Sequence, residues 1–242
     1  DTTNGPVKLA DLRPDKNSRY GWSDIGNGNL FADWYKNKAR YVPERKRWYI
    51  YNGKVWEPDS GNLRAMELCK DLADALAVYA LSIQDEKQRG AYQAHVGKWQ
   101  RRTNRETILK DVHPVSMTEF DQDLHLFNCK NGTLDLNTRE FRPHSPSDLL
   151  ATVSSVKYDP EAKSELWERF INDIMQGDHD TAAYLQKAMG YGLTGDTSEE
   201  CFFTLYGATT RNGKGTLMET YMTLVGGYGR AARPETITQK DK

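Results

Sequence analysis

A glycine-rich loop followed by a lysine holds the residues best suited to chemistry in this chain of 242 residues. The stretch Gly207–Thr216 reads GATTRNGKGT, and its glycines would let backbone N–H groups approach a phosphate closely. A helix predicted from Lys214 to Val225 would direct its positive dipole end at the same anion, while the Lys214 ammonium reached the β- and γ-phosphates. We therefore expect nucleotide binding, with no catalytic residue in this segment beyond Lys214. The expected nucleotide-binding residues are Gly207, Asn212, Gly213, Lys214, Gly215 and Thr216.

The loop departs from the usual phosphate-binding pattern in two ways. Five residues rather than four separate Gly207 from Gly213, and Gly215 stands where the pattern has the Ser or Thr whose hydroxyl holds Mg²⁺. Binding through the backbone and Lys214 survives both changes, but the ligand that holds Mg²⁺ stays open between water and a carboxylate elsewhere. The alternative interpretation is a glycine-rich turn that contains a lysine by chance.

A strand and a helix have to position this loop. The run Cys201–Tyr206 is almost wholly apolar, which predicts a strand buried on both faces of a parallel sheet, and the helix from Lys214 follows the loop. Upstream, apolar residues at helical spacing predict one helix over residues 63–84. A second and more basic helix is predicted over about residues 91–110.

Local turn signals predict short β structure and two further helices. Asn52 and Gly53 separate two aromatic runs, which is the strongest short-range hairpin signal. Residues 124–156 predict short strands joined by tight turns, a β-meander. Asp159, followed by proline, and Asp178 each predict the start of a helix, the first of them with a buried apolar face.

Any nucleic-acid site has to be local, because the formal net charge of the whole chain is only -1. The predicted helix over residues 91–110 carries the most basic stretch. It would either grip DNA phosphates and stack a base, or form a solvated helix face. The candidate DNA-binding residues are Lys98, Trp99, Arg101, Arg102 and Arg105.

Cysteine and acid spacing predicts no metal site. The three cysteines, Cys69, Cys129 and Cys201, are far apart and form no C-x-x-C pair, which fits a reducing cytosol better than a disulfide framework. Asp121 and Asp123 are similar to the paired acids of a primase metal site, but we favour a turn that leads into the next strand. No apolar run approaches the ~18 residues of a membrane span, so no membrane partner is expected.

Several blocks in a consistent order resemble a known family. Residues 126–136, LFNCKNGTLDL, are similar to the LLN-x-x-NG-x-LDL signature of phage, plasmid and poxvirus primase–helicases. Later blocks that resemble the same family are Tyr158–Pro160, Trp167–Phe170, Leu185–Tyr191, Leu193–Glu199 and Phe202–Gly207. The phosphate loop of the family typically ends N-G-K-S-T, and Asn212–Thr216 differs from it at Gly215. The resemblance covers about residues 60–242.

The resemblance implies a superfamily-three helicase, an ATP-dependent DNA helicase that replicates a phage or mobile element. Such a motor has an AAA+-like fold and works as a homo-oligomer, a hexameric ring. It hydrolyses ATP with Mg²⁺ and translocates on single-stranded or forked DNA. The implied setting is the cytoplasm of the host cell, with an upstream primase domain joined through the first residues of this chain.

Residues and resemblance together predict an α/β chain. An α+β adaptor, mainly helical in its middle with short β-hairpins, would lead into the start of a P-loop AAA+-like parallel sheet. The predicted divisions are a linker and β-hairpin segment over residues 1–60, an adaptor or collar domain over 61–199, and a truncated helicase motor over 200–242. The family's Walker B strand, sensor and arginine finger follow the loop, so we expect a fragment that is inactive alone.

Two other functions stay open at this point. One is a non-enzymatic DNA-loading or oligomerisation module with an incomplete nucleotide site. The other is a small P-loop kinase or metabolic ATPase, which predicts a loop near the start of its domain. The residues that precede Gly207 and the ordered family blocks count against the kinase.

Overall fold

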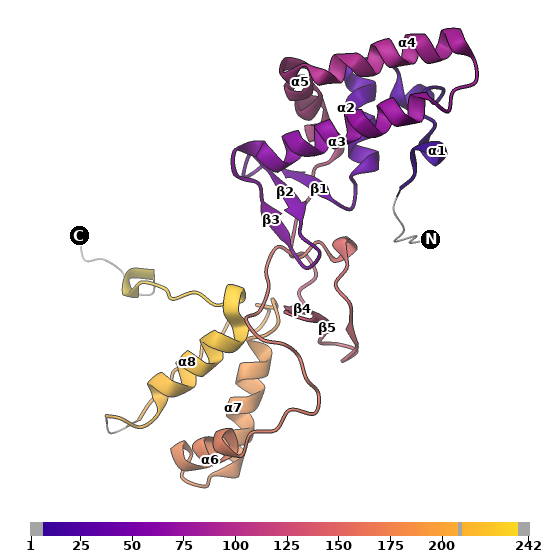
Figure 1. Cartoon of the computed structure of the whole chain (residues 1–242). Helices are drawn as coiled ribbons and strands as arrows, with labels where there is room; N and C mark the ends of the chain where they lie inside the picture. Colours follow the sequence, from indigo (N-terminus) through magenta and orange to yellow (C-terminus); the bar gives the residue numbers. More distant parts are fainter. Residues whose placement is uncertain (1–6, 208–209, 237–242) are drawn as a thin grey trace, which may run out of the picture. The chain divides into compact units, whose positions relative to one another are not determined.

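The computed structural model describes residues 7–207 and 210–236, which form two compact units (Figure 1). The first unit ends at Glu119, and the second contains the described residues from Phe120 onward together with residues 53–55. Each unit is α+β with one three-stranded antiparallel sheet, and about half of the described residues are helical. The predicted divisions at residues 60 and 199 stay a prediction.

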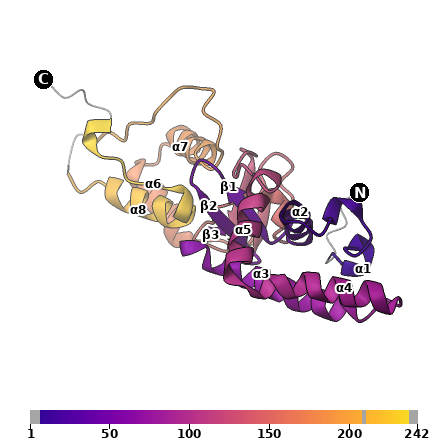
Figure 2. The same cartoon turned by 90° about the horizontal axis from the view of Figure 1, so that it is seen from above.

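The first unit is built on α3 (Leu63–Ala80), whose buried residues recur at helical spacing. Cys69, Leu72 and Leu76 are each at most 1% exposed, so one stripe of the helix faces the core. The other helices of this unit are α1 (Leu9–Leu12), α2 (Asp24–Trp34), α4 (Glu86–Val96) and α5 (Arg102–Val112). Helix α4 runs alongside α3 in both views (Figures 1 and 2). The helix predicted over residues 63–84 is confirmed and ends at Ala80.

A buried carboxylate fixes the start of α3. Asp59 is 3% exposed and accepts the backbone N–H groups of Arg64 and Ala65 at 3.1 and 2.8 Å. N–H groups in the first turn of a helix have no acceptor within the helix, so a side-chain acceptor at this point stabilises the helix start.

The predicted basic helix over residues 91–110 is broken in two, and this part of the prediction is wrong. Helix α4 ends at Val96, a 3-10 turn follows, and α5 begins after Arg101, whose backbone is extended. The break brings the Trp99 indole into the core, where it is 1% exposed. Arg105 then donates hydrogen bonds to the carbonyl oxygens of Trp99 and Gln100 at 2.8 and 2.7 Å, which satisfies the backbone of the turn.

The first sheet confirms the predicted hairpin with a longer connection. It contains β1 (Ala39–Val42), β2 (Arg47–Tyr51) and β3 (Trp56–Pro58) in that order, all antiparallel. Tyr51 pairs with Trp56, so four residues rather than two join β2 to β3. Gly53 in this connection has a φ of +100°, a conformation that favours glycine.

The second unit confirms the predicted β-meander, and two asparagines of the family-like signature hold it. Its strands are β4 (Leu126–Cys129), β5 (Gly132–Asp135) and β6 (Phe141–Arg142). The fully buried amide of Asn128 donates to the carbonyl oxygens of Lys54 and Thr152, both at 3.1 Å. Asn131 donates to the Tyr158 carbonyl at 2.9 Å and accepts the Tyr158 N–H at 2.8 Å, as a strand neighbour would.

Three helices complete the second unit: α6 (Glu165–Ile174), α7 (His179–Tyr191) and α8 (Lys214–Val225). The start predicted at Asp178 is confirmed, because its carboxylate accepts the N–H groups of Asp180 and Thr181. The start predicted at Asp159 is wrong, since Ser164 caps α6 instead, and none of the residues of α6 is buried. No helix in the described ranges is both long and apolar enough to cross a membrane.

The strand predicted over Cys201–Tyr206 does not form in this structure, and the described residues contain no parallel sheet. Phe202 and Tyr206 are 82% and 88% exposed, whereas a central strand would be buried on both faces. A strand needs a neighbouring strand to satisfy its backbone groups, and none of the described strands pairs with this run.

Asn128 provides a test of the second sheet. We expect Asn128→Ala to lower local stability by about 2–3 kcal/mol, because it removes the hydrogen bonds that this fully buried amide donates to the carbonyl oxygens of Lys54 and Thr152. Amide hydrogen exchange in β4 and β5 measures this loss. The exposed Asn137→Ala should change protection in these strands little. Equal protection in the two variants would contradict the structural role of Asn128.

His95 provides a test of the first unit by pH. Burial, and next the Lys98 ammonium, lower the pKa of His95, so below pH ~6.5 the unfolded chain binds a proton that the folded chain does not. We therefore expect the free energy of unfolding of the first unit to fall as the pH drops below about 6.5. The fall ends once the pH is below the pKa of His95 in the folded chain. His95→Gln should flatten this fall.

Urea unfolding followed by tryptophan fluorescence measures the pH dependence, because five of the six tryptophans belong to the first unit. His179→Gln in the second unit is the matched control and should leave the profile unchanged. A profile that is the same in His95→Gln and the parent chain would show that His95 does not contribute.

Candidate nucleotide-binding site

Helix α8 begins at Lys214 and ends at Val225, as predicted from the sequence. Gly213 precedes it with a φ of +82°, and its carbonyl accepts the Leu217 N–H at 2.9 Å to close the first turn. The N–H groups of this turn have no acceptors within the helix, and the helix dipole places partial positive charge at the same end. The start of α8 is therefore suited to an anion.

Close contacts explain two of the glycines in the loop. A Cβ on Gly213 would lie 2.5 Å from the Ile174 side chain of α6, so the loop packs directly on that helix. A Cβ on Gly207 would lie 1.9 Å from the Asn212 amide nitrogen, so the loop folds back on itself. Residues 208 and 209 between these glycines lie outside the described residues.

Three of the predicted binding residues gather at one point. The Lys214 ammonium donates to Asn212 Oδ1 at 2.6 Å, and it lies 3.1 Å from where a Cβ of Gly207 would be. Both side chains are half-buried. Gly215 and Thr216 are exposed on the first turn of α8, and no heavy atom approaches the Cβ position of Gly215 within 4 Å. All six predicted residues thus surround the head of α8.

A cavity of about 520 Å³ opens beside the loop. Gly207, Asn212 and Lys214 line one part of it, and Tyr184 and Phe203 line another. The two rings meet edge to face with centroids 6.4 Å apart. Ligand pockets for small molecules commonly have about 300–1,000 Å³, with a few polar groups among apolar ones. The sequence did not single out Tyr184 or Phe203 for this site, because Tyr184 is distant from the loop along the chain and Phe203 was expected in a buried strand.

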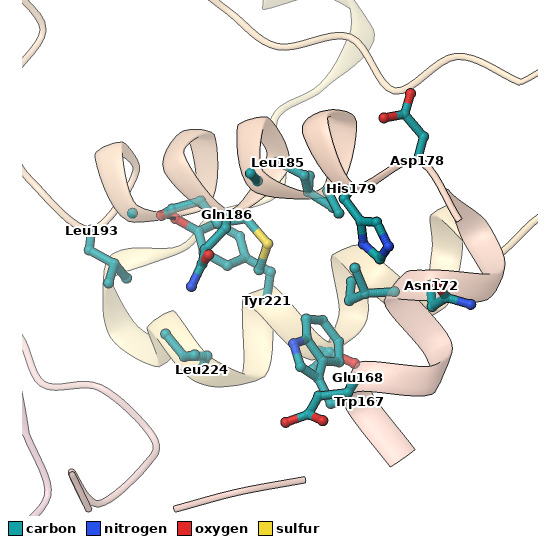
Figure 3. Close-up of a pocket in the computed structure, with 16 residues that line it drawn as sticks. Trp167, Glu168, Asn172, Asp178, His179, Leu185, Gln186, Leu193, Tyr221 and Leu224 are labelled. Atoms are coloured by element: carbon teal, nitrogen blue, oxygen red, sulfur yellow. Dashed lines mark hydrogen bonds between the residues drawn. The ribbon is translucent and has the colours of Figure 1, made fainter. Parts of the chain in front are cut away.

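A second and larger cavity lies between α6, α7 and α8 and has different chemistry (Figure 3). Its volume is about 1010 Å³, and Trp167, Leu185 and Leu224 lie around it. It is lined by two carboxylates, Glu168 and Asp178, and by no lysine or arginine among the described residues. Carboxylates repel phosphate, so the smaller cavity with Lys214 is the better site for a nucleotide.

The candidate DNA-binding residues do not form one surface. Lys98, Arg101 and Arg102 are exposed, and Arg102 pairs with Glu106 at 2.8 Å. Trp99 and Arg105 are 1% and 8% exposed and belong to the interior of the first unit. Their side chains are therefore not available to a base or a phosphate in this structure.

The acids considered for a metal site bind backbone groups instead. Asp121 accepts the Ala151 N–H at 2.9 Å, and Asp123 accepts the His125 N–H at 3.0 Å. Among the residues that the structure describes, no three His, Cys, Asp or Glu side chains converge in a way that would hold a metal ion.

Two glycines of the loop offer a matched test of its geometry. We expect Gly213→Ala to lower the stability of the loop and α8 by about 1–3 kcal/mol, because the new Cβ meets α6 and the positive φ is strained. Gly215→Ala has open space within a helix and should be neutral or stabilising by up to about 1 kcal/mol. Hydrogen exchange in α8 measures both; similar protection in the two variants would refute the contact.

A known protein family matches the part of the chain that precedes this loop. The family described as "D5 N terminal like" matches residues 28–176, which is more than half of the chain. No curated protein matches the chain. The matched range includes the first sheet, most of the helices of the first unit, and the β-meander with its two signature asparagines. The chain therefore belongs to the D5 N terminal like family, the N-terminal region of phage, plasmid and poxvirus D5-type primase–helicase proteins.

Proposed function

We propose that this chain is a segment of an ATP-dependent DNA helicase of the superfamily-three type, from a phage or mobile element, and that it binds ATP phosphates through Gly207–Thr216. Family membership supports a primase–helicase as the parent protein. The observation that carries the proposal for this segment is the half-buried Lys214 ammonium at the head of α8, beside a cavity of nucleotide size.

The phosphates would bind at the start of α8. Backbone N–H groups from Gly213 to Thr216 would donate to them, and Lys214 would exchange its contact with Asn212 Oδ1 for a phosphate oxygen. The apolar part of the same cavity would hold the base and ribose near Tyr184 and Phe203.

Mg²⁺ would accompany ATP as a further cofactor. Gly215 offers no hydroxyl to it, and the nearest hydroxyl in the sequence is that of the exposed Thr216. Phosphate oxygens and water would supply most of its ligands, as is usual for this cation. The carboxylates that polarise water for hydrolysis would come from residues outside this loop.

The finer features of the parent protein belong to the same proposal. Single-stranded or forked DNA would be the substrate, and identical subunits would form a hexameric ring in the host cytoplasm, with an upstream primase domain. The run Cys201–Tyr206 would become a strand of the parallel AAA+-like sheet, with Phe202 and Tyr206 on the face that is covered and Phe203 on the face toward the cavity. The large aromatic side chains of Phe202 and Tyr206 are exposed in this structure because none of the described strands covers them.

Replacement of Lys214 tests the nucleotide site. We expect Lys214→Ala to weaken ATP binding about 10- to 100-fold, because a charge-assisted hydrogen bond to phosphate contributes about 1.5–3 kcal/mol. Isothermal titration of the chain with ATP and Mg²⁺ measures the affinity. Lys187→Ala, which removes an exposed lysine of α7, is the control and should change it little.

An ATP affinity that Lys214→Ala leaves unchanged would contradict the proposal. That outcome would favour the alternative function, a non-enzymatic DNA-loading or oligomerisation module with an incomplete nucleotide site. The observation that favours this alternative is Gly215, which stands where the usual loop has a hydroxyl side chain for Mg²⁺.

A further inference from the structure

An exposed indole rests on a rigid support in the first unit. Trp22 is 40% exposed, and its ring stacks on His95 with centroids 5.6 Å apart and an interplanar angle of 16°. Tyr92 supports the same ring from a tilted position at 5.4 Å. Both supporting residues belong to α4 and are buried. One part of the indole is therefore held by the protein while the rest faces solvent.

A small polar cavity lies beside this indole. Its volume is about 60 Å³, and its lining includes Trp22, Asn27, His95, Lys98 and Trp99. Two nitrogen atoms in its lining residues, Nδ1 of His95 and Nε1 of Trp99, are buried and have no hydrogen-bond partner among the described residues. These side chains are only 7% and 1% exposed, and buried polar atoms without a partner are rare in folded proteins.

The two unpartnered atoms differ in chemistry. Nε2 of His95 lies 3.0 Å from Asn27 Oδ1, so Nε2 carries the proton of the neutral imidazole and Nδ1 is an acceptor. Trp99 Nε1 is always a donor. The cavity has room for about two water molecules, which is too little for a nucleobase but enough for its edge or a bridging water.

One lysine shares the cavity with the indole. Lys98 lines the cavity and is exposed. Asp24 is the one carboxylate among the lining residues. The structure thus places the Lys98 ammonium beside an exposed aromatic ring, in a chain whose net charge is near zero.

We propose that Trp22 and Lys98 form a binding site for one nucleotide unit of single-stranded DNA. The base would stack on the exposed part of the Trp22 indole, and the adjoining phosphate would bind the Lys98 ammonium. The base edge would reach His95 and Trp99 in the polar cavity, directly or through water. A duplex would bind less well, because its bases expose no free face. The choice of DNA rests on the proposed helicase function.

This site uses a different tryptophan from the one that the basic stretch of the sequence indicated. Trp99 contributes its buried N–H to the wall of the cavity, whereas the ring available for stacking is Trp22. Trp22 lies before α2, far along the chain from Lys98, so only the folded structure brings the two together.

Fluorescence anisotropy with a labelled oligothymidylate of about 15 nucleotides tests the site. We expect Trp22→Ala to weaken binding by the chain roughly 5- to 100-fold, since a stacked base contributes about that factor. Trp22→Phe keeps a flat ring and should retain most of the affinity. Ile25→Ala is the matched control, because Ile25 is a neighbouring apolar residue that is 71% exposed; it should bind as the parent chain does.

Lys98 is tested by salt dependence. Lys98→Ala should lower the slope of log affinity against log salt by about one, as expected for one phosphate contact. Lys87→Ala, which removes another exposed lysine of the first unit, should leave the slope unchanged. Circular dichroism of each variant checks that the fold is intact, and Trp22→Phe keeps the test valid if Trp22→Ala fails to fold.

Several results would overturn the inference: no binding of the oligonucleotide, equal affinity in Trp22→Phe, Trp22→Ala and the parent chain, or a preference for duplex DNA or for RNA. ATP titration of the same proteins separates this inference from the proposed nucleotide site. We expect Trp22→Ala to leave ATP affinity unchanged and Lys214→Ala to leave oligonucleotide affinity unchanged. Loss of one ligand without the other shows which of the two sites has failed.

Discussion

Gly213 decides where helix α8 begins, because it takes a left-handed backbone while it touches α6. Its φ is +82°, and a Cβ there would lie 2.5 Å from Ile174. A side chain at this position would separate the loop from α6 or displace the first turn of α8. The same turn sets the direction of the unpaired N–H groups and brings Lys214 within 2.6 Å of Asn212. The cation, the amide groups and the cavity beside them all depend on this one contact.

Most features of the fold that depend on local chemistry were predictable from the sequence, with the exception of the start of α6, which Ser164 caps in place of Asp159. Asp178 caps α7, and α8 begins and ends at the residues predicted, because capping and glycine conformations act within a few residues. Features that depend on distant partners were not. The helix over residues 91–110 breaks because the core takes in Trp99, and Cys201–Tyr206 forms no strand because no neighbouring strand accompanies it. Apolar side chains occur in buried turns such as the one at Trp99 and in exposed runs such as Cys201–Tyr206, as well as in helices and strands. Apolar character alone therefore does not predict which of these forms.

The same division holds for the sites. The loop motif predicted which residues would surround the head of α8, since their roles follow from backbone geometry within ten residues. The aromatic side of the cavity was not predicted, because Tyr184 comes from α7 and Phe203 was expected to be covered in a strand. The position of Trp22 beside Lys98 is likewise a product of packing in the first unit. Charge and aromatic content near each other in sequence singled out Trp99, but the chain turns there and the structure buries this ring.

The two asparagines of the family-like signature are separate from the residues proposed to bind ligands. Asn128 and Asn131 use their amides to hold backbone segments of the second unit, and the family match ends at residue 176, before the phosphate loop. Family membership and loop chemistry therefore support the helicase proposal independently.

The proposed ATP and DNA sites share no residue and belong to different units. Any coupling between them is a reciprocal free energy, in which ATP changes DNA affinity by the same factor that DNA changes ATP affinity. We expect each site to be removable without loss of the other, so that factor can be measured from both sides in one protein.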